Sequence, residues 1–80
     1  MVKITYDPTV DAAYVAFVEV GPGDSVATVN LEPVAGATLV NADIDANGHL
    51  LGIEFIGASH VFAAEVLREA PLPEPFDPLP

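Results

Sequence analysis

The sequence predicts an α+β protein with a single antiparallel sheet of about five strands and one C-terminal helix. Three observations support this prediction. Several short segments before residue 57 alternate between apolar and polar residues with a period of two. Clusters of glycine, proline, asparagine and aspartate separate these segments, as turns separate strands. Residues 59–70 instead show the apolar spacing of a helix, and Pro71 stops that pattern.

Three strands are expected in the first part of the chain. Residues 2–6 have one apolar face and end at an Asp-Pro pair, which favours a turn because proline presets φ and aspartate accepts a backbone N–H. Residues 13–20 are apolar at both parities, which predicts a central strand covered on both faces. After a Gly-Pro-Gly-Asp turn, residues 25–31 form the third predicted strand.

A β-hairpin is expected over residues 40–56, with its turn at Asn47-Gly48. This dipeptide is the strongest short hairpin signal, because both residues tolerate positive φ. Residues 40–45 alternate strictly between apolar and polar, so the polar face of the first strand is expected to contact solvent. The second strand should follow the turn directly, over residues 49–56.

The parity of the side chains constrains the length of this turn. Residues paired across an antiparallel ladder share a face, so an even number of loop residues is needed for the two apolar faces to coincide. A two-residue turn meets this condition and predicts three pairs: Ile44 with Leu51, Ala42 with Ile53, and Val40 with Phe55. A four-residue loop over residues 45–48 keeps the same parity and is the alternative.

The same hairpin contains a calcium-loop pattern, D-x-[DN]-x-[DN]-G-x5-E. The matching residues are Asp43, Asp45, Asn47, Gly48 and Glu54. A calcium loop of this class needs a helix on each side to hold its oxygen ligands around the ion. The flanking residues here have the pattern of strands. We therefore interpret the pattern as an acidic hairpin turn, and predict no metal site and no cofactor.

The C-terminal part of the chain predicts a helix followed by an extended tail. Ser59 is the expected N-cap, and the apolar stripe consists of Phe62, Ala63, Val66, Leu67 and Ala70. Of these, Phe62, Val66 and Leu67 are expected to form an interface with the sheet of the same subunit or of a neighbour. Residues 71–80 are half proline and should be extended. The predicted organisation is therefore one domain, residues 1–70, and a proline-rich tail, residues 71–80, in which a PxxP string spans 75–78.

Composition limits the classes of partner. Of 80 residues, 51% are apolar and 18% are charged, which is typical of one small folded domain. Twelve acidic residues face only two basic ones, giving a net charge of −10. Nucleic acid and anionic membranes are therefore unsuitable partners, whereas a basic protein would be attracted.

The absence of cysteine excludes disulfides and thiolate chemistry. The N-terminus lacks the apolar run of a signal peptide, and the longest uncharged apolar stretch, residues 12–18, is far shorter than a spanning helix, so a cytoplasmic location is expected.

Two blocks of sequence resemble a known family. Residues 4–15 contain Tyr-Asp-Pro and Asp-Ala-Ala-Tyr, and residues 43–59 read D-x-D-x-x-G-x-x-x-G-I-E-F-x-x-A-S. In this order, over about residues 3–59, the blocks resemble the small bacterial proteins catalogued as domain of unknown function 2283 (DUF2283). The resemblance implies a small α+β fold built on an antiparallel sheet and no established activity. It also implies one conceivable role, as an antitoxin-like partner of a small basic protein.

The candidate catalytic residues are the carboxylates Asp7, Asp11 and Glu54. Asp7 and Asp11 lie near two tyrosines at strand ends, where a carboxylate pair can perform acid/base chemistry. The structural interpretation is that both aspartates stabilise turns and that Glu54 lies on the exposed face of the sheet, unless a subunit or the helix covers it. The histidines at 49 and 60 lack a spaced third ligand for zinc.

Two functional hypotheses follow. The first is a non-enzymatic, homo-oligomeric interaction module, because one short helix cannot cover a sheet with so many apolar residues. The rival hypothesis is a small hydrolase or isomerase that uses the three carboxylates. A concave pocket lined by those carboxylates would favour the enzyme, and a flat apolar face would favour the module.

Overall fold

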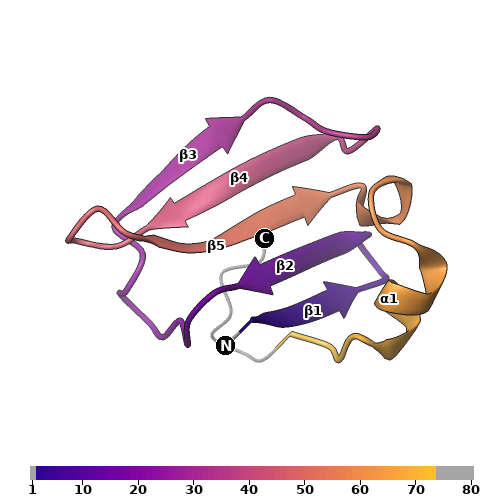
Figure 1. Cartoon of the computed structure of the whole chain (residues 1–80), viewed down its shortest axis with the longest axis horizontal. Coiled ribbons are helices and arrows are strands. Elements are labelled where there is room, and N and C mark those ends of the chain that lie inside the picture. The colour runs from indigo at the N-terminus through magenta and orange to yellow at the C-terminus, as the bar shows by residue number, and fades with distance from the viewer. Residues whose placement is uncertain (1, 74–80) are drawn as a thin grey trace.

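The computed structural model describes residues 2–73, which form one five-stranded antiparallel sheet with the strand order β1-β2-β5-β4-β3 (Figure 1). The strands are β1 (Lys3–Asp7), β2 (Ala12–Ala16), β3 (Ala27–Leu31), β4 (Leu39–Ile44) and β5 (Leu50–Ile56). A 3₁₀ turn, η1 (Ala58–His60), and a helix, α1 (Ala64–Glu69), follow. The predicted fold class is confirmed. Most of the predicted tail, including the PxxP string at 75–78, lies outside the described residues.

The central strand of the sheet is β5, and β2 is shorter than predicted. The strand expected over residues 13–20 ends at Ala16, after which the Phe17 N–H donates one more bond to the Leu51 carbonyl, at 2.9 Å. Because β5 begins at Leu50, it offers no partner to the residues that follow Phe17. Val18 is consequently 48% exposed, so this part of the prediction is wrong.

The β4–β5 hairpin has the predicted register away from its turn. Val40 pairs with Phe55 and Ala42 with Ile53. Near the turn, the ladder shifts between Asp43 and Ile44, so that Ile44 pairs with Leu50 and not with Leu51. Such a bulge adds one residue to one strand.

The turn of this hairpin contains three residues, which is neither of the predicted lengths. The Asp45 N–H donates to the His49 carbonyl, and the Gly48 N–H donates to the Asp45 carbonyl. Gly48 has a φ of 82°, as expected for a turn glycine. The Asp45 carboxylate favours the wider turn, because its Oδ1 accepts the Asn47 and His49 N–H groups at 3.0 and 2.8 Å. The bulge then restores the parity that the odd loop would break.

The predicted eleven-residue helix is replaced by two short pieces. Ser59 lies inside η1, and the residue before α1 is Ala63, which makes no side-chain capping bond, so the prediction that Ser59 caps the helix is wrong. The physical reason is that Ser59 has another partner, since both its N–H and its hydroxyl bind Asp11. The helix ends at Glu69, ahead of Pro71 as predicted.

One end of the sheet carries the packed core. Leu67 of α1 is buried together with Ala13 and Ala58, and Phe62 packs against Phe55 in an edge-to-face arrangement with ring centroids 5.0 Å apart. Val66, the third residue of the predicted interface, is 39% exposed. The helix therefore covers only the end of the sheet where β1 and β2 meet, as Figure 1 shows. No helix among residues 2–73 is long and apolar enough to cross a membrane.

Candidate functional site

Asp11, Tyr6 and Ser59 form a hydrogen-bonded cluster, the Asp11 cluster, that joins the β1–β2 turn to the segment after β5. Asp11 Oδ1 accepts the Tyr6 hydroxyl at 2.7 Å and the Ser59 N–H at 3.0 Å, and Asp11 Oδ2 accepts the Ser59 hydroxyl at 2.7 Å. The backbone carbonyl of Asp11 accepts the N–H groups of Gly57 and Ala58. Asp11 adopts a φ of 53°, a left-handed conformation that aspartate tolerates better than most residues. Two loops distant in sequence are thus fixed by a single residue.

The hydrogen bonds of the Asp11 cluster keep the Asp11 carboxyl group ionised. Burial alone would raise the pKa of Asp11, but the hydrogen bonds from Tyr6 and Ser59 and the nearby His60 outweigh it, so the pKa lies below its ordinary value. The hydrogen bond to Asp11 raises the pKa of Tyr6. At neutral pH the phenol therefore keeps its proton and the carboxylate stays charged. This pair is suited to holding structure, because neither group is poised to exchange a proton.

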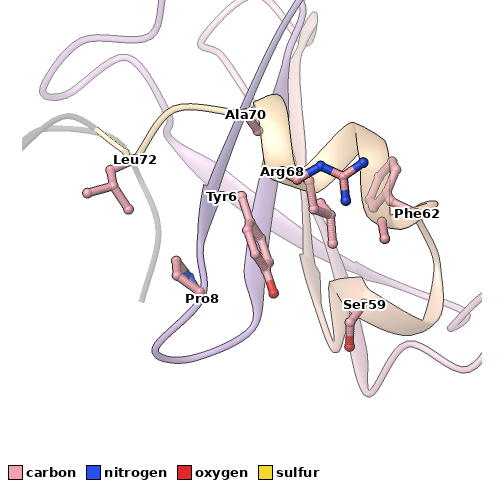
Figure 2. A pocket seen from close by; sticks show the side chains of 9 residues that line it. Tyr6, Pro8, Ser59, Phe62, Arg68, Ala70 and Leu72 are labelled. Carbon is pink, nitrogen blue, oxygen red and sulfur yellow. The ribbon is translucent and has the colours of Figure 1, made fainter.

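A pocket of about 490 Å³ lies beside the Asp11 cluster, between the β1–β2 turn, η1 and α1 (Figure 2). Its walls are mostly carbon: the lining residues are Tyr6, Pro8, Ser59, Phe62, Ala64, Leu67, Arg68, Ala70 and Leu72. Figure 2 shows Phe62 and Arg68 on one side of the Tyr6 ring, and Pro8 and Leu72 on the other. Arg68 is the only charged residue in the lining. The pocket is therefore an apolar cleft with a single cation.

Asp7 has a local structural role. Its Oδ1 accepts the Thr9 N–H at 3.0 Å and the Thr9 hydroxyl at 2.6 Å, which closes the turn after β1. This is the turn that the Asp-Pro pair predicts. Neither Asp7, Asp11 nor Glu54 lines the pocket.

The opposite face of the sheet carries a second polar cluster, built around Asp43. The Tyr14 hydroxyl donates to Asp43 Oδ2 at 2.9 Å, and the Thr28 hydroxyl donates to Asp43 Oδ1 at 2.8 Å. The Tyr14 ring reaches Asp43 by lying over Gly52, where a Cβ atom would come within 2.5 Å of the hydroxyl. This explains the glycine in the middle of β5, because only a residue without a side chain leaves room for the ring.

Glu54 belongs to the same cluster and is buried. It lies between Tyr14 of β2 and Asn41 of β4, and only 8% of it is exposed. Among the described residues, its Oε2 atom is buried without a hydrogen-bond partner. Burial raises the pKa of Glu54 and the nearby Asp43 raises it further, while a hydrogen bond with Asn41 opposes this. The expectation that this face is solvent-exposed is wrong, since Asp43 and Glu54 are both buried.

The residues of the calcium pattern do not surround one point. Asp43 binds Tyr14 and Thr28, and Asp45 binds the backbone of its own turn. No group of three or more histidine, aspartate or glutamate side chains with the spacing of a metal site occurs within residues 2–73. That the protein binds no metal stays a prediction. Both histidines, at 49 and 60, are exposed.

Sequence reasoning missed three features of these sites: the partnership of Ser59 with Asp11, the burial of Asp43 beneath Tyr14, and the position of Arg68 in a pocket. The first two join residues 48 and 29 positions apart, a separation that no local pattern reveals. A usable signal for the third was available, since Arg68 is one of only two basic residues in the chain.

The fold and these sites define a small α+β protein with one antiparallel sheet, a short helix over one end and polar side chains gathered on the opposite face. The chain belongs to the family described as protein of unknown function (DUF2283), whose sequence model matches residues 3–59. Comparisons with curated proteins and with solved structures gave no significant match. The matched residues include the Asp11 cluster and end before α1, so the pocket has one wall inside the matched residues and one beyond them.

Proposed function

We propose that this protein is a homo-oligomeric interaction module that assembles through the free edge of β3. The observation that carries the proposal is the chemistry of that edge. All five residues of β3 are exposed, and none is charged or a proline. Natural proteins usually protect an exposed edge strand with charged residues or proline, because the unpaired backbone groups of the strand would otherwise pair with another chain.

The register of the sheet identifies the backbone groups that are available. The Phe17 N–H donates to Leu51, which fixes the direction in which backbone groups point on β2 and β5. Alternation through the β5–β4 and β4–β3 ladders then directs the N–H and C=O groups of Thr28 and Asn30 away from the sheet. These two residues present the donors and acceptors that an added strand requires.

A second copy of the chain fits this edge better than an unrelated strand. In an antiparallel arrangement centred on Val29, Thr28 of one copy lies opposite Asn30 of the other, so all the outward groups of both residues are paired. Glu32 then lies opposite Val26, and no carboxylate faces its own copy across the ladder. The apolar faces of both sheets become continuous, since Val29 and Leu31 share the face that includes Ala42 and Val40.

The other edge of the sheet is less suited to assembly. The Tyr6 N–H of β1 already donates to the Pro71 carbonyl at 2.8 Å, so the segment after α1 occupies part of that edge. Two alternatives stay predictions. A basic protein partner agrees with the net charge of −10, and a carboxylate enzyme would need Asp7, Asp11 and Glu54 in one pocket, whereas the described pocket contains none of them.

Sedimentation velocity at micromolar concentration tests the proposal. The wild-type protein is expected to sediment with twice the 8.3 kDa mass of the chain. Val29→Lys should restore the monomer, because it places two ammonium groups opposite each other at the centre of the interface. Val18→Lys is the matched control, since Val18 is 48% exposed, Val29 is 47% exposed, and the change in charge is the same. A monomeric wild-type protein, or identical behaviour of the two variants, would refute the proposal.

A further inference from the structure

The pocket beside α1 has the properties of a small-molecule site. Its volume of about 490 Å³ lies within the range of ligand pockets, roughly 300–1,000 Å³. Ligand pockets are typically apolar with a few polar groups that fix orientation. Here Phe62, Leu67 and Leu72 supply apolar walls, and the polar groups come from three residues, Tyr6, Ser59 and Arg68. The question is what those three groups can recognise.

The two hydroxyls in the pocket cannot donate to a ligand. Each hydroxyl has one proton, and the protons of Tyr6 and Ser59 are both engaged by Asp11, at 2.7 Å in each case. The carboxylate of Asp11 also makes that end of the pocket unfavourable for an anion. Among the side chains that line the pocket, only Arg68 retains donors for a ligand.

Arg68 has no anionic partner within the part of the chain that the structure describes. Twelve acidic residues compete for two bases, and Glu65 and Glu69 are close to Arg68 in sequence. No ion pair or hydrogen bond nevertheless joins the Arg68 side chain to any of residues 2–73. An arginine presents a planar set of N–H donors that matches a carboxylate. An unpaired guanidinium beside an apolar pocket is therefore complementary to a ligand with both characters.

We propose that this pocket binds a small monocarboxylic acid with an apolar body. The carboxylate pairs with Arg68, and the body lies along the Tyr6 ring toward Pro8 and Leu72, on the side of the ring away from Arg68 in Figure 2. The Asp11 carboxylate, which accepts the hydroxyls of Tyr6 and Ser59, disfavours placing the ligand carboxylate at those hydroxyls. The site lies at the β1 edge of the sheet, and β3 forms the opposite edge, so the inference does not depend on assembly through β3.

Titration of isotope-labelled protein by nuclear magnetic resonance tests this site, with octanoate as the probe and octan-1-ol as its uncharged analogue. Octanoate should bind and shift the resonances of Tyr6, Phe62 and Leu67, and octan-1-ol should bind about tenfold more weakly. Arg68→Gln should weaken octanoate binding about tenfold, because the charge-assisted hydrogen bonds are lost, and should leave octan-1-ol binding unchanged.

Lys3→Gln is the matched control, because it removes the only other basic side chain and changes the net charge by the same amount. Lys3 and Arg68 are both exposed, so neither substitution is expected to disturb folding, and the unliganded spectra check this directly. The proposal requires that Lys3→Gln leaves octanoate affinity within about twofold of wild type. It is overturned if octanoate does not shift the pocket resonances, if octan-1-ol binds as tightly as octanoate, or if the two variants weaken octanoate binding equally.

Discussion

Replacing Gly52 by alanine is expected to be the most damaging small change to the sheet. A Cβ atom at this position would lie 2.5 Å from the Tyr14 hydroxyl oxygen and 2.6 and 2.7 Å from two of the ring carbons. The Tyr14 side chain is only 2% exposed, so the ring cannot move outward without leaving its site. Its displacement would also break the hydrogen bond to the buried Asp43.

The magnitude follows from these two effects. Overpacking of a buried site destabilises a protein by about 1–3 kcal/mol, and loss of a hydrogen bond to a charged group adds about 1.5–3 kcal/mol. Removing glycine flexibility from the unfolded chain offsets about 0.4–1 kcal/mol. Gly52→Ala should therefore lower the free energy of unfolding by about 2–5 kcal/mol, a large share of the roughly 5–15 kcal/mol typical of a folded domain.

Urea denaturation measures this effect, and a double-mutant cycle identifies its cause. Gly21→Ala is the control, because the nearest atom to its Cβ is Asp24 Oδ2 at an ordinary 3.5 Å, and its unfolding free energy should change little. In a Tyr14→Ala background, Gly52→Ala should also become nearly harmless, since the ring that causes the clash is gone. If Gly52→Ala behaves like Gly21→Ala, or keeps its full effect without the ring, then the close packing of Tyr14 on Gly52 is not the reason for the glycine.

Four further predictions concern the hairpin, the buried carboxyl and the helix. Burial raises the pKa of Glu54 above its ordinary 4.5, so the ionised carboxylate destabilises the fold as pH rises through the folded-state pKa. Glu54→Gln should therefore increase stability near neutral pH and change it little well below pH 4.5. Thermal denaturation measures both effects. Gly48→Val should lower stability by about 1–3 kcal/mol, because a β-branched residue rarely adopts the observed φ of 82°; an unchanged melting temperature would contradict the turn. Phe62→Ala should lower stability by about 1–3 kcal/mol, which is less than the loss expected for a fully buried ring. His60→Ala, at an exposed position, should leave stability unchanged. Equal effects of the two substitutions would exclude Phe62 from the core. Calorimetric titration should detect no tight 1:1 calcium binding, and binding that Asp45→Ala abolishes would overturn the hairpin interpretation.

Local patterns were sufficient to predict much of the sheet. Alternation identified the strands, and the rule that paired residues share a face placed Val40 opposite Phe55 and Ala42 opposite Ile53. The same rule led to the wrong loop length, because it assumed an unbroken ladder. The structure satisfies the rule by a different route, in which an odd turn held by Asp45 is followed by a compensating bulge. Parity thus requires the total number of loop and bulge residues to be even, and side-chain hydrogen bonds decide how many of them lie in the loop and how many in the bulge.

The candidate sites were less predictable, because their geometry depends on residues distant in sequence. A serine before an apolar stripe is typical of a helix cap, and nothing adjacent to Ser59 indicates that Asp11 takes both of its donors instead. Alternation likewise indicates that Glu54 and Asp43 share the polar face of their strands, but it does not show whether that face is buried. Burial of a polar face is a property of the tertiary structure, since it depends on Tyr14 of another strand.

The hydrogen bond from the Tyr6 N–H to the Pro71 carbonyl bears on how far the proposed self-association would proceed. A sheet with two open edges can add copies at both, and the product is an open-ended filament. Here the segment after α1 supplies a carbonyl to part of the edge of β1, so within residues 2–73 the edge of β3 is the more open of the two. A two-fold arrangement of two β3 strands consumes both open edges at once. The proposed assembly through β3 would therefore stop at two copies, and a change that detaches residue 71 from β1 is expected to let further copies add at that edge.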